Sequence, residues 1–331
     1  MGKLLTFSVA AYNIADYLEQ LLGSFDLTSL SDDVEILIVN DGSTDGTSKI
    51  AHLYKERYPD IIKVIDKDNR GHGSTINTGI EYAEGKYFRA LDGDDWVDKD
   101  SLYRLIELLE TIDVDLVITD FTWCYTDKCI YDKWCGYEPG KIFDFDNICG
   151  DLPYLRYHNV IYKTGILKDY HLHLDENCFY VDTEFICYPM INIKSAVYYD
   201  LPLYCYRMGN SGQSVSNESR IKHLSDSLKV SESLIEFYLD KSDTINSSQR
   251  KLVLNCVCSI VSWHIVSLAT REYSSTNRDE IKKFYRECVL SIPQLKRDLI
   301  TFSTGKRKRF LLKDPSGRYL LYRCISNFLG R

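Results

Sequence analysis

Residues 35–57 read EILIVNDGSTDGTSKIAHLYKER, an apolar run, a polar turn and an amphipathic stretch in direct succession. The uninterrupted Ile, Leu and Val residues indicate a strand that is buried on both faces. Ile50, Leu53 and Tyr54 recur at helical spacing and predict a helix over residues 47–57. A buried strand that leads through a tight turn into a helix is the repeating unit of a parallel α/β sheet.

The same alternation of strand and helix patterns extends over the first 120 residues. Further strands are predicted at residues 5–10, 61–65, 87–91 and 116–119. Further helices are predicted at residues 17–25, 74–83 and 101–109, the last with Asp100 as its N-cap. The predicted fold class is therefore α/β, with a mostly parallel sheet flanked by helices and ligands beyond the carboxyl ends of the strands.

The later part of the chain has a different pattern. Residues 120–215 are aromatic-rich and irregular, with hairpin-like pieces at 129–140 and 196–207, and helical patterns begin at Ile221. The longest apolar stretch, Leu252 to Ala269, is interrupted by Asn255, His264 and three serines. A membrane-spanning helix needs about 20 mostly apolar residues, so this stretch is interpreted as a buried core helix.

The composition is that of a soluble globular protein. The chain has 331 residues, of which 44% are hydrophobic and 27% charged, with 40 Lys+Arg against 48 Asp+Glu. A net charge of −8 argues against nucleic acid as the main partner. The charge is unevenly placed, because residues 296–331 hold ten basic and two acidic residues. This tail is therefore +8, and residues 1–295 are −16.

The cysteines and the N-terminus predict a cytoplasmic protein. Eleven cysteines include no C-x-x-C pair and no zinc-binding spacing, which indicates free thiols in a reducing compartment. The N-terminus runs directly into the first predicted strand and does not have the pattern of a signal peptide. His171 and His173, with Asp175 nearby, are interpreted as loop residues and not as metal ligands.

Carboxylates follow two of the predicted strands. Asp41 stands after the strand at 35–39, where its side chain can accept a hydrogen bond from a ligand. Gly42 and Gly46 permit a tight turn, and Asp45 is suited to cap the next helix. A capped turn explains Asp45 but leaves Asp41 unexplained, so Asp41 is predicted to contact a ligand.

The second acidic segment is Leu91-Asp92-Gly93-Asp94-Asp95-Trp96, at the end of the strand at 87–91. Three carboxylates within four residues repel one another, and a divalent cation removes that repulsion. Mg²⁺ and Mn²⁺ prefer such oxygens, and Mg²⁺ usually adds phosphate oxygens to one or two carboxylates. A solvated acidic turn is the alternative, but the hydrophobic flanks argue against it. The segment predicts a metal–diphosphate site, and Gly71-His72-Gly73 offers backbone N–H groups to an anion.

In this order, the segments resemble the inverting family 2 glycosyltransferases, which have a GT-A fold. The resemblance is carried by Ser8–Asn13 with Tyr17-Leu18, Val39–Thr47, Asn69-Arg70-Gly71, Asn77-Thr78-Gly79, Ala83–Tyr87 and Leu91–Trp96. The match is dense up to Trp96 and weaker to about residue 215. Asn40 departs from the family, which usually has an aspartate at that position.

The resemblance implies transfer of a sugar, with inversion, from a UDP-sugar or related nucleotide sugar to a hydroxyl of a glycan or lipid-linked acceptor. It places this reaction in the assembly of bacterial cell-surface polysaccharides or glycoconjugates. The implied cofactor is Mn²⁺ or Mg²⁺, held by Asp94 and Asp92. Asp41 resembles the family's uracil-contacting aspartate. The residues implied in binding the nucleotide sugar are Ala11, Asn13, Asp41, Asn69, Gly71, Asp92, Gly93, Asp95 and Arg207.

The family's general base is an aspartate at the start of a helix past the sheet, often preceded by Glu. Asp182 fits that place, although Val181 stands where Glu is usual. A helix N-cap is the alternative for Asp182, and Glu184 is the second candidate for the base. Arg207 resembles a basic residue that approaches the diphosphate, and a surface arginine at a strand end is its alternative.

The resemblance also implies a domain organisation. A GT-A catalytic domain is expected at residues 1–215, with a nucleotide-binding half at 1–120 and an acceptor-binding half at 121–215. Candidates for acceptor contacts are Trp123, Trp134, Tyr137 and His158. A helical region at 216–295 and a basic amphipathic tail at 296–331 follow. The tail either attaches to an anionic membrane, on the inner face of the cell membrane, or packs as a terminal helix.

Two rival functions belong to other classes. A non-catalytic nucleotide-sugar-binding module of the same fold is the alternative to an enzyme. A sugar-phosphate nucleotidyltransferase needs a Gly-rich loop with Arg and Lys after the first strand, and Ala10-Ala11-Tyr12-Asn13 has none.

Overall fold

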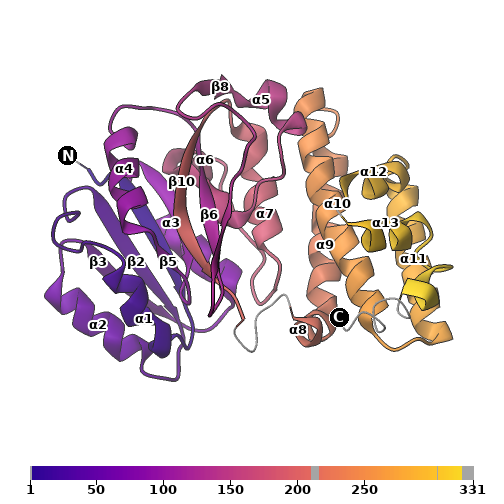
Figure 1. Cartoon of the computed structure of the whole chain (residues 1–331), viewed down its shortest axis with the longest axis horizontal. Helices are drawn as coiled ribbons and strands as arrows, with labels where there is room; N and C mark the ends of the chain where they lie inside the picture. The colour runs from indigo at the N-terminus through magenta and orange to yellow at the C-terminus, as the bar shows by residue number, and fades with distance from the viewer. Residues whose placement is uncertain (1, 210–215, 304, 323–331) are drawn as a thin grey trace. The chain divides into compact units, whose positions relative to one another are not determined.

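The computed structural model describes residues 2–209, 216–303 and 305–322 (Figure 1). The chain forms two compact units, each with its own core. The first unit comprises Met1–Ile148 and Leu152–Asn210, and the second comprises Cys149–Asp151 and Ser211–Arg331.

The first unit is built on one mixed sheet, and the predicted α/β class is confirmed. Along its main path the strand order is β3-β2-β1-β4-β9-β6-β10-β5 in the described residues. The parallel part consists of β1 (Leu5–Ala11), β2 (Val34–Asp41), β3 (Ile62–Lys67) and β4 (Tyr87–Asp92). Every residue of β2 is buried, as expected for a central strand that is covered on both faces.

Helices connect these parallel strands. They are α1 (Ala15–Gly23), α2 (Thr47–Arg57) and α3 (His72–Tyr82). The chain steps outward from β1 to β2 to β3 and then returns past β1 to β4. Because such crossovers are right-handed, α1 and α2 cover one face and α3 covers the other, as Figure 1 shows. The carboxyl ends of β1, β2 and β4 consequently meet at one edge of the sheet.

The second half of the sheet is mixed. β9 (Val160–Lys163) runs antiparallel between β4 and β6 (Leu116–Cys124), and β10 (Ser195–Arg207) runs parallel to β6. The short strands are β5 (Trp96–Val97), β7 (Cys129–Asp132) and β8 (Ile142–Asp144). The short helices are α5 (Phe145–Ile148), α6 (Thr164–Asp169) and α7 (Asp182–Cys187).

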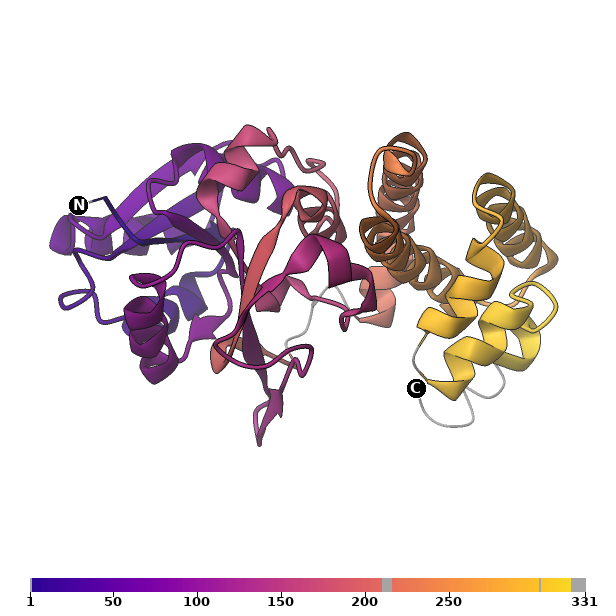
Figure 2. The same ribbon diagram turned by 90° about the horizontal axis from the view of Figure 1, so that it is seen from above.

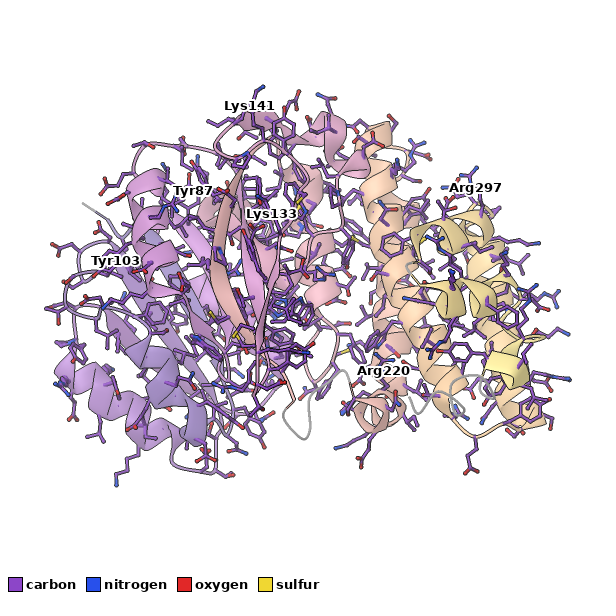
Figure 3. The ribbon with its side chains drawn as sticks, in the orientation of Figure 1. Tyr87, Tyr103, Lys133, Lys141, Arg220 and Arg297 are labelled. Carbon is purple, nitrogen blue, oxygen red and sulfur yellow. The ribbon has the colours of Figure 1, made fainter. Side chains whose placement is uncertain are left out.

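Two local predictions were wrong. Residues 196–207 are part of one long strand, β10, because Pro202 lies in a bulge that bends the strand without reversing it. The cap of α4 (Lys99–Leu109) is Asp98, whose Oδ1 accepts from the N–H of Ser101 at 2.8 Å. Asp100 lies inside the first turn of that helix. From the same helix Tyr103 (Figure 3) donates its hydroxyl to Asp26 at 2.7 Å.

The second unit is helical in the residues that the structure describes. Its helices are α8 (Asn217–Lys222), α9 (Leu224–Lys241), α10 (Ser247–Thr270), α11 (Ser275–Ser291), α12 (Leu295–Phe302) and α13 (Lys306–Lys313). The central helix α10 begins with a capping box between Asn246 and Gln249. It packs against α9, as Figure 2 also shows. Its length and apolar composition would suit a membrane span, but 78% of its apolar window is buried. That burial fits the predicted core helix.

The start of the basic tail packs inside this unit. Leu295, Leu299, Leu311 and Leu312 are fully buried, as is Tyr319, whose hydroxyl donates to the carbonyl oxygens of two residues after α10 at 2.8 and 2.9 Å. The apolar side of the tail therefore contributes to a helical core, as in the packed alternative. Three further apolar residues of the amphipathic tail predicted at 296–331, Ile325, Phe328 and Leu329, lie outside the described residues.

Candidate functional site

The two acidic segments lie at the same edge of the sheet. Asp41 ends β2 and Asp92 ends β4, and β1 lies between these two strands. Asp92 is opposite Ala10, and Asn40 is opposite Ala11. The tertiary structure thus places Ala11, Asp41 and Asp92, three of the residues predicted to bind the nucleotide sugar, on neighbouring strand ends.

The carboxylate of Asp41 orders the loop that follows β3. It is 2% exposed and lies 2.5 Å from the Lys67 ammonium. It also accepts from the backbone N–H groups of Arg70 at 3.0 Å and Gly71 at 2.8 Å. The side chain therefore has a structural role in this loop, and its contact with a uracil base stays a prediction.

Other residues that were predicted to bind the nucleotide sugar hold the adjacent turns together. Asn13, in the left-handed region with φ 52°, accepts from the Thr44 N–H at 2.8 Å through its side chain. A Cβ on Gly42 would lie 2.9 Å from the Asn69 nitrogen, so glycine is required where these loops meet. A Cβ on Gly93 would lie 2.5 Å from the Ala10 carbonyl oxygen, which imposes the same requirement on the acidic turn.

In that acidic turn, Asp95 is the most enclosed carboxylate, with 1% exposure. It accepts from the Tyr204 hydroxyl at 2.6 Å and from the Arg207 N–H at 2.7 Å. Burial, together with the charges of Asp92 and Asp94, raises the pKa of Asp95 well above its usual range. Burial likewise raises the pKa of Asp92 to about 6, with His72 opposing the shift and Asp182 adding to it. These carboxylates carry an electrostatic cost that a bound cation would relieve.

His158 completes a group that can hold a metal ion. Ligand atoms of Asp92, Asp95 and His158 all lie within 4.8 Å of one another. The His158 ring stacks on Tyr206 with centroids 4.3 Å apart, and its Nδ1 is buried without a hydrogen-bond partner among the described residues. Burial lowers the pKa of His158 to about 3, so the imidazole is neutral and its free nitrogen can serve as a ligand.

This donor set fits a divalent cation. Two carboxylates and a neutral imidazole suit a transition metal such as Mn²⁺ better than Mg²⁺, which prefers oxygen ligands alone. Of the two predicted metal ligands, Asp92 belongs to the group and Asp94 does not. The Asp94 carbonyl oxygen accepts from Arg207 Nε at 2.7 Å, and its carboxylate remains a predicted ligand.

His72 bridges the metal group and the predicted base. Its Nε2 lies 3.5 Å from Oδ1 of Asp182 and 3.7 Å from Oδ1 of Asp92. Desolvation in the site lowers the pKa of His72, but the hydrogen bond to Asp182 and the negative charges of Asp92, Asp182 and Asp41 prevail and raise it to about 9. Desolvation by the surrounding side chains opposes ionisation of Asp182, yet His72 holds the pKa of Asp182 below its usual value. At neutral pH an imidazolium therefore lies between two carboxylates.

Glycines allow His72 to take this position. Gly71 has a φ of 82°, and a Cβ on Gly73 would lie 2.1 Å from the carbonyl oxygen of Asp175. The Arg70 carbonyl accepts from the Asn177 N–H at 2.6 Å, which ties the same turn to the loop before α7. The glycines of Gly71-His72-Gly73 indicated only backbone N–H groups, and no pattern in the sequence pointed to the side-chain role of His72.

The local structure bears on the helix-cap alternative for Asp182 and on Glu184, the second candidate for the base. The cap position of α7 is Val181, and Asp182 is the first helical residue, with a side chain that is 55% exposed. Glu184 is buried, and it accepts from the Asp175 N–H at 3.0 Å. Asp182 is thus the accessible carboxylate of the two.

Arg207 connects the acidic turn to α1. Its guanidinium donates to the Asp94 carbonyl and to Gln20 Oε1 at 2.6 Å. It lies over the rings of Trp96 and Tyr17, with its central carbon 4.7 and 5.0 Å from their centroids. This arrangement differs from a free surface arginine, and contact with a diphosphate stays a prediction.

The aromatic residues that were predicted to contact the acceptor substrate lie in different parts of the first unit. Trp123 packs on Tyr206 at 5.2 Å, beside His158. Trp134 is buried against Tyr198 at 5.2 Å, and Tyr137 stacks on Phe143 at 4.1 Å. Trp123 and His158 are therefore close to the carboxylates, whereas Trp134 and Tyr137 pack with other aromatic residues.

Comparison with known proteins identifies sequence relatives of this chain and solved structures that share its fold. The sequence profile described as "Glycosyl transferase family 2" matches residues 6–170. An uncharacterized glycosyltransferase of Bacillus subtilis, EpsJ, is 37% identical over 131 residues, which is 40% of this chain and 38% of that protein. A Staphylococcus aureus poly-beta-1,6-N-acetyl-D-glucosamine synthase is 39% identical over 103 residues, 31% of this chain and 24% of the synthase. The matched region is therefore well under half the length of either relative.

Solved structures share the fold over most of the chain. S. aureus TarS 1-349 in complex with UDP-GlcNAc aligns with a TM-score of 0.70 and 16% identity, covering 99% of this chain and 92% of the TarS 1-349 chain. The mannosyltransferase PcManGT of Pyrobaculum calidifontis, in complex with GDP-Man and Mn²⁺, aligns with a TM-score of 0.55 and 15% identity, covering 99% and 87%. These alignments show a GT-A-like fold.

Proposed function

Because residues 6–170 belong to glycosyl transferase family 2, we propose that this chain transfers a sugar from a nucleotide diphosphate donor to an acceptor hydroxyl, with inversion. The observation that carries the proposal is the position of the accessible Asp182 beside the cation-binding group, with His72 between them. A carboxylate that is ionised at neutral pH and a group that can hold a cation are what such a displacement needs.

The residues divide the reaction between them. Asp92, Asp95 and His158 would hold Mn²⁺, which would neutralise charge on the leaving diphosphate. Asp182 accepts the proton of the acceptor hydroxyl as that oxygen bonds to the anomeric carbon and the bond to the diphosphate breaks. Base and leaving group lie on opposite faces of the sugar, so the configuration inverts.

His72 is a positioning residue in this scheme. Its imidazolium holds Asp182 in the ionised form and sets the carboxylate's direction. The same charge reduces repulsion between Asp92 and Asp182. A lower pKa makes Asp182 a weaker base, so His72 contributes by orienting the carboxylate and keeping it charged, and not by raising its basicity.

The proposed donor is a UDP-sugar, and the proposed acceptor is a glycan or lipid-linked hydroxyl in cell-surface polysaccharide assembly. The UDP-GlcNAc complex of TarS and the name of the S. aureus synthase support this choice, and the GDP-Man complex of PcManGT supplies the competitor to test. The proposed location is the cytoplasm, at the inner face of the membrane, because the tail is +8.

A donor panel tests the function. UDP-GlcNAc, other UDP-sugars and GDP-Man are screened with and without Mn²⁺ by thermal shift, and the donors that bind are then assayed for transfer and slow hydrolysis. We expect Mn²⁺-dependent binding of a UDP-sugar and its turnover. Binding without transfer or hydrolysis of any donor would favour the alternative, a non-catalytic nucleotide-sugar-binding module.

A further inference from the structure

The helical unit contains a basic cavity that the proposed reaction does not use. A cavity of about 580 Å³ lies between α12 and the segment from α13 to Arg318. Lys306, Arg309, Lys313 and Arg318 line it, together with Ile300, Thr301 and Phe310. A smaller cavity of about 210 Å³ is lined by Lys306, Arg307, Phe310 and Tyr322. The two cavities share Lys306 and Phe310.

Within residues 2–209, 216–303 and 305–322, the cations of the larger cavity, which are Lys306, Arg309, Lys313 and Arg318, have no carboxylate partner. In the part of the unit that the structure describes, nearby ion pairs join Arg271 to Glu280 and Arg297 to Asp298. None of the ion pairs between described residues includes any of the four cavity cations. The carboxylate of Asp314 is turned to the Gly317 N–H, at 3.1 Å. The cavity therefore has a positive potential that an anion can neutralise.

Two arginines are held in place by backbone carbonyls. Arg309 Nε donates to the Ser303 oxygen at 2.6 Å. Arg318 donates to the Phe310 oxygen at 3.2 Å, and its central carbon lies 4.7 Å from the centroid of the Phe310 ring. These contacts use only part of each guanidinium, so N–H groups remain for an acceptor. Fixed donors lose little entropy on binding, which favours a phosphate.

We propose that this cavity binds the phosphate of an anionic phospholipid headgroup and holds the chain at an anionic membrane surface. The proposal rests on the membrane location proposed above and is independent of the chemistry in the first unit. Leu320 and Leu321, which follow the cavity, are 49% and 53% exposed. A soluble phosphate makes no use of these leucines, whereas a lipid surface buries them. Because residues 1–295 are −16, attraction to an anionic surface is concentrated in the tail.

Vesicle sedimentation of the full chain tests the site. The probe is vesicles with about one-third phosphatidylglycerol in phosphatidylcholine, compared with pure phosphatidylcholine. The test variant is Lys306→Gln/Lys313→Gln, which removes two cavity charges that take part in no side-chain hydrogen bond or ion pair among the described residues. The matched control is Lys282→Gln/Lys283→Gln, which removes two exposed charges from α11.

We expect binding to the anionic vesicles to fall about 30-fold in the cavity variant and to stay close to wild type in the control. Equal losses in both variants would reduce the effect to net charge and overturn the proposal. Binding of inorganic pyrophosphate at the cavity without vesicle binding would overturn the lipid assignment. The thermal shift produced by UDP-GlcNAc with Mn²⁺ is measured on the same variants, so failure of the donor site is distinguished from failure of this one.

Discussion

Nε2 of His72 lies 3.5 Å from Oδ1 of Asp182, which joins the first turn of α3 to the first residue of α7. The same nitrogen lies 3.7 Å from Asp92, at the end of β4. One imidazolium thereby couples the proposed base to the proposed metal group. A single side chain therefore contacts both the residue proposed to remove the proton and a residue proposed to hold the metal that stabilises the leaving group.

Asp182→Asn removes the proposed base without changing the size of the side chain. Transfer is expected to fall by about 10²–10⁴-fold, because the amide cannot accept the acceptor proton. Donor affinity, measured by calorimetry, should change little. Glu184→Gln is the comparison variant, and equal transfer by wild type and Asp182→Asn would exclude Asp182 as the base.

His72→Gln removes the positive charge beside Asp182 and keeps a polar side chain. The pKa of Asp182 should then rise, because its main ionising partner is lost. The acid limb of the kcat/KM profile should therefore move to higher pH. A purely structural role would lower activity at all pH values and leave the limb in place. Thermal denaturation at neutral pH checks that the variant is folded.

His158→Phe keeps an aromatic ring on Tyr206 but removes the proposed nitrogen ligand. Mn²⁺-dependent donor affinity is expected to fall about tenfold or more, measured by calorimetry with and without Mn²⁺. Asp94→Asn is assayed in parallel, because its carboxylate was predicted as a ligand but lies outside the structural group. A loss of Mn²⁺-dependent donor affinity in Asp94→Asn, with no loss in His158→Phe, would indicate that Asp94 and not His158 is the metal ligand.

The second unit should lose stability in acid through His264. This residue is 3% exposed, its Nδ1 lies 2.8 Å from the Ser227 hydroxyl oxygen, and its ring packs on Phe284 at 4.4 Å. Burial, with Arg271 adding, lowers the pKa of His264 to about 4. A depressed histidine pKa gives stability that is present above the unfolded value of about 6.5 and is lost as pH falls toward 4.

The size of this effect follows from the shift. The free energy of unfolding should decrease by about 3 kcal/mol between pH 7 and pH 4 from this group. Urea denaturation followed across that range measures it. His264→Gln, which cannot become charged, should show a flatter dependence, and an unchanged slope in that variant would assign the acid sensitivity elsewhere.

Much of the first unit could be predicted because its signals are local. The apolar run at 35–39 and the helical spacing at 47–57 correspond to β2 and α2. The sequence could not separate a bulge from a turn at Pro202, because both suit proline and only pairing with β6 distinguishes them. The sequence also could not predict that His158 lies beside Asp92, because the two residues belong to no common motif.

By itself, the sequence determined the parallel α/β unit, the acidic turn at the end of β4 and the concentration of basic charge in the tail. These properties depend on residue type and near-neighbour spacing. Only the tertiary structure decided that His72 lies between Asp92 and Asp182, that Asp95 and His158 share a group with Asp92, and that the tail's cations line a cavity. The physical reason is that electrostatic and coordination contacts depend on distances of a few ångströms between segments far apart in the chain, which the packing of the sheet and helices fixes.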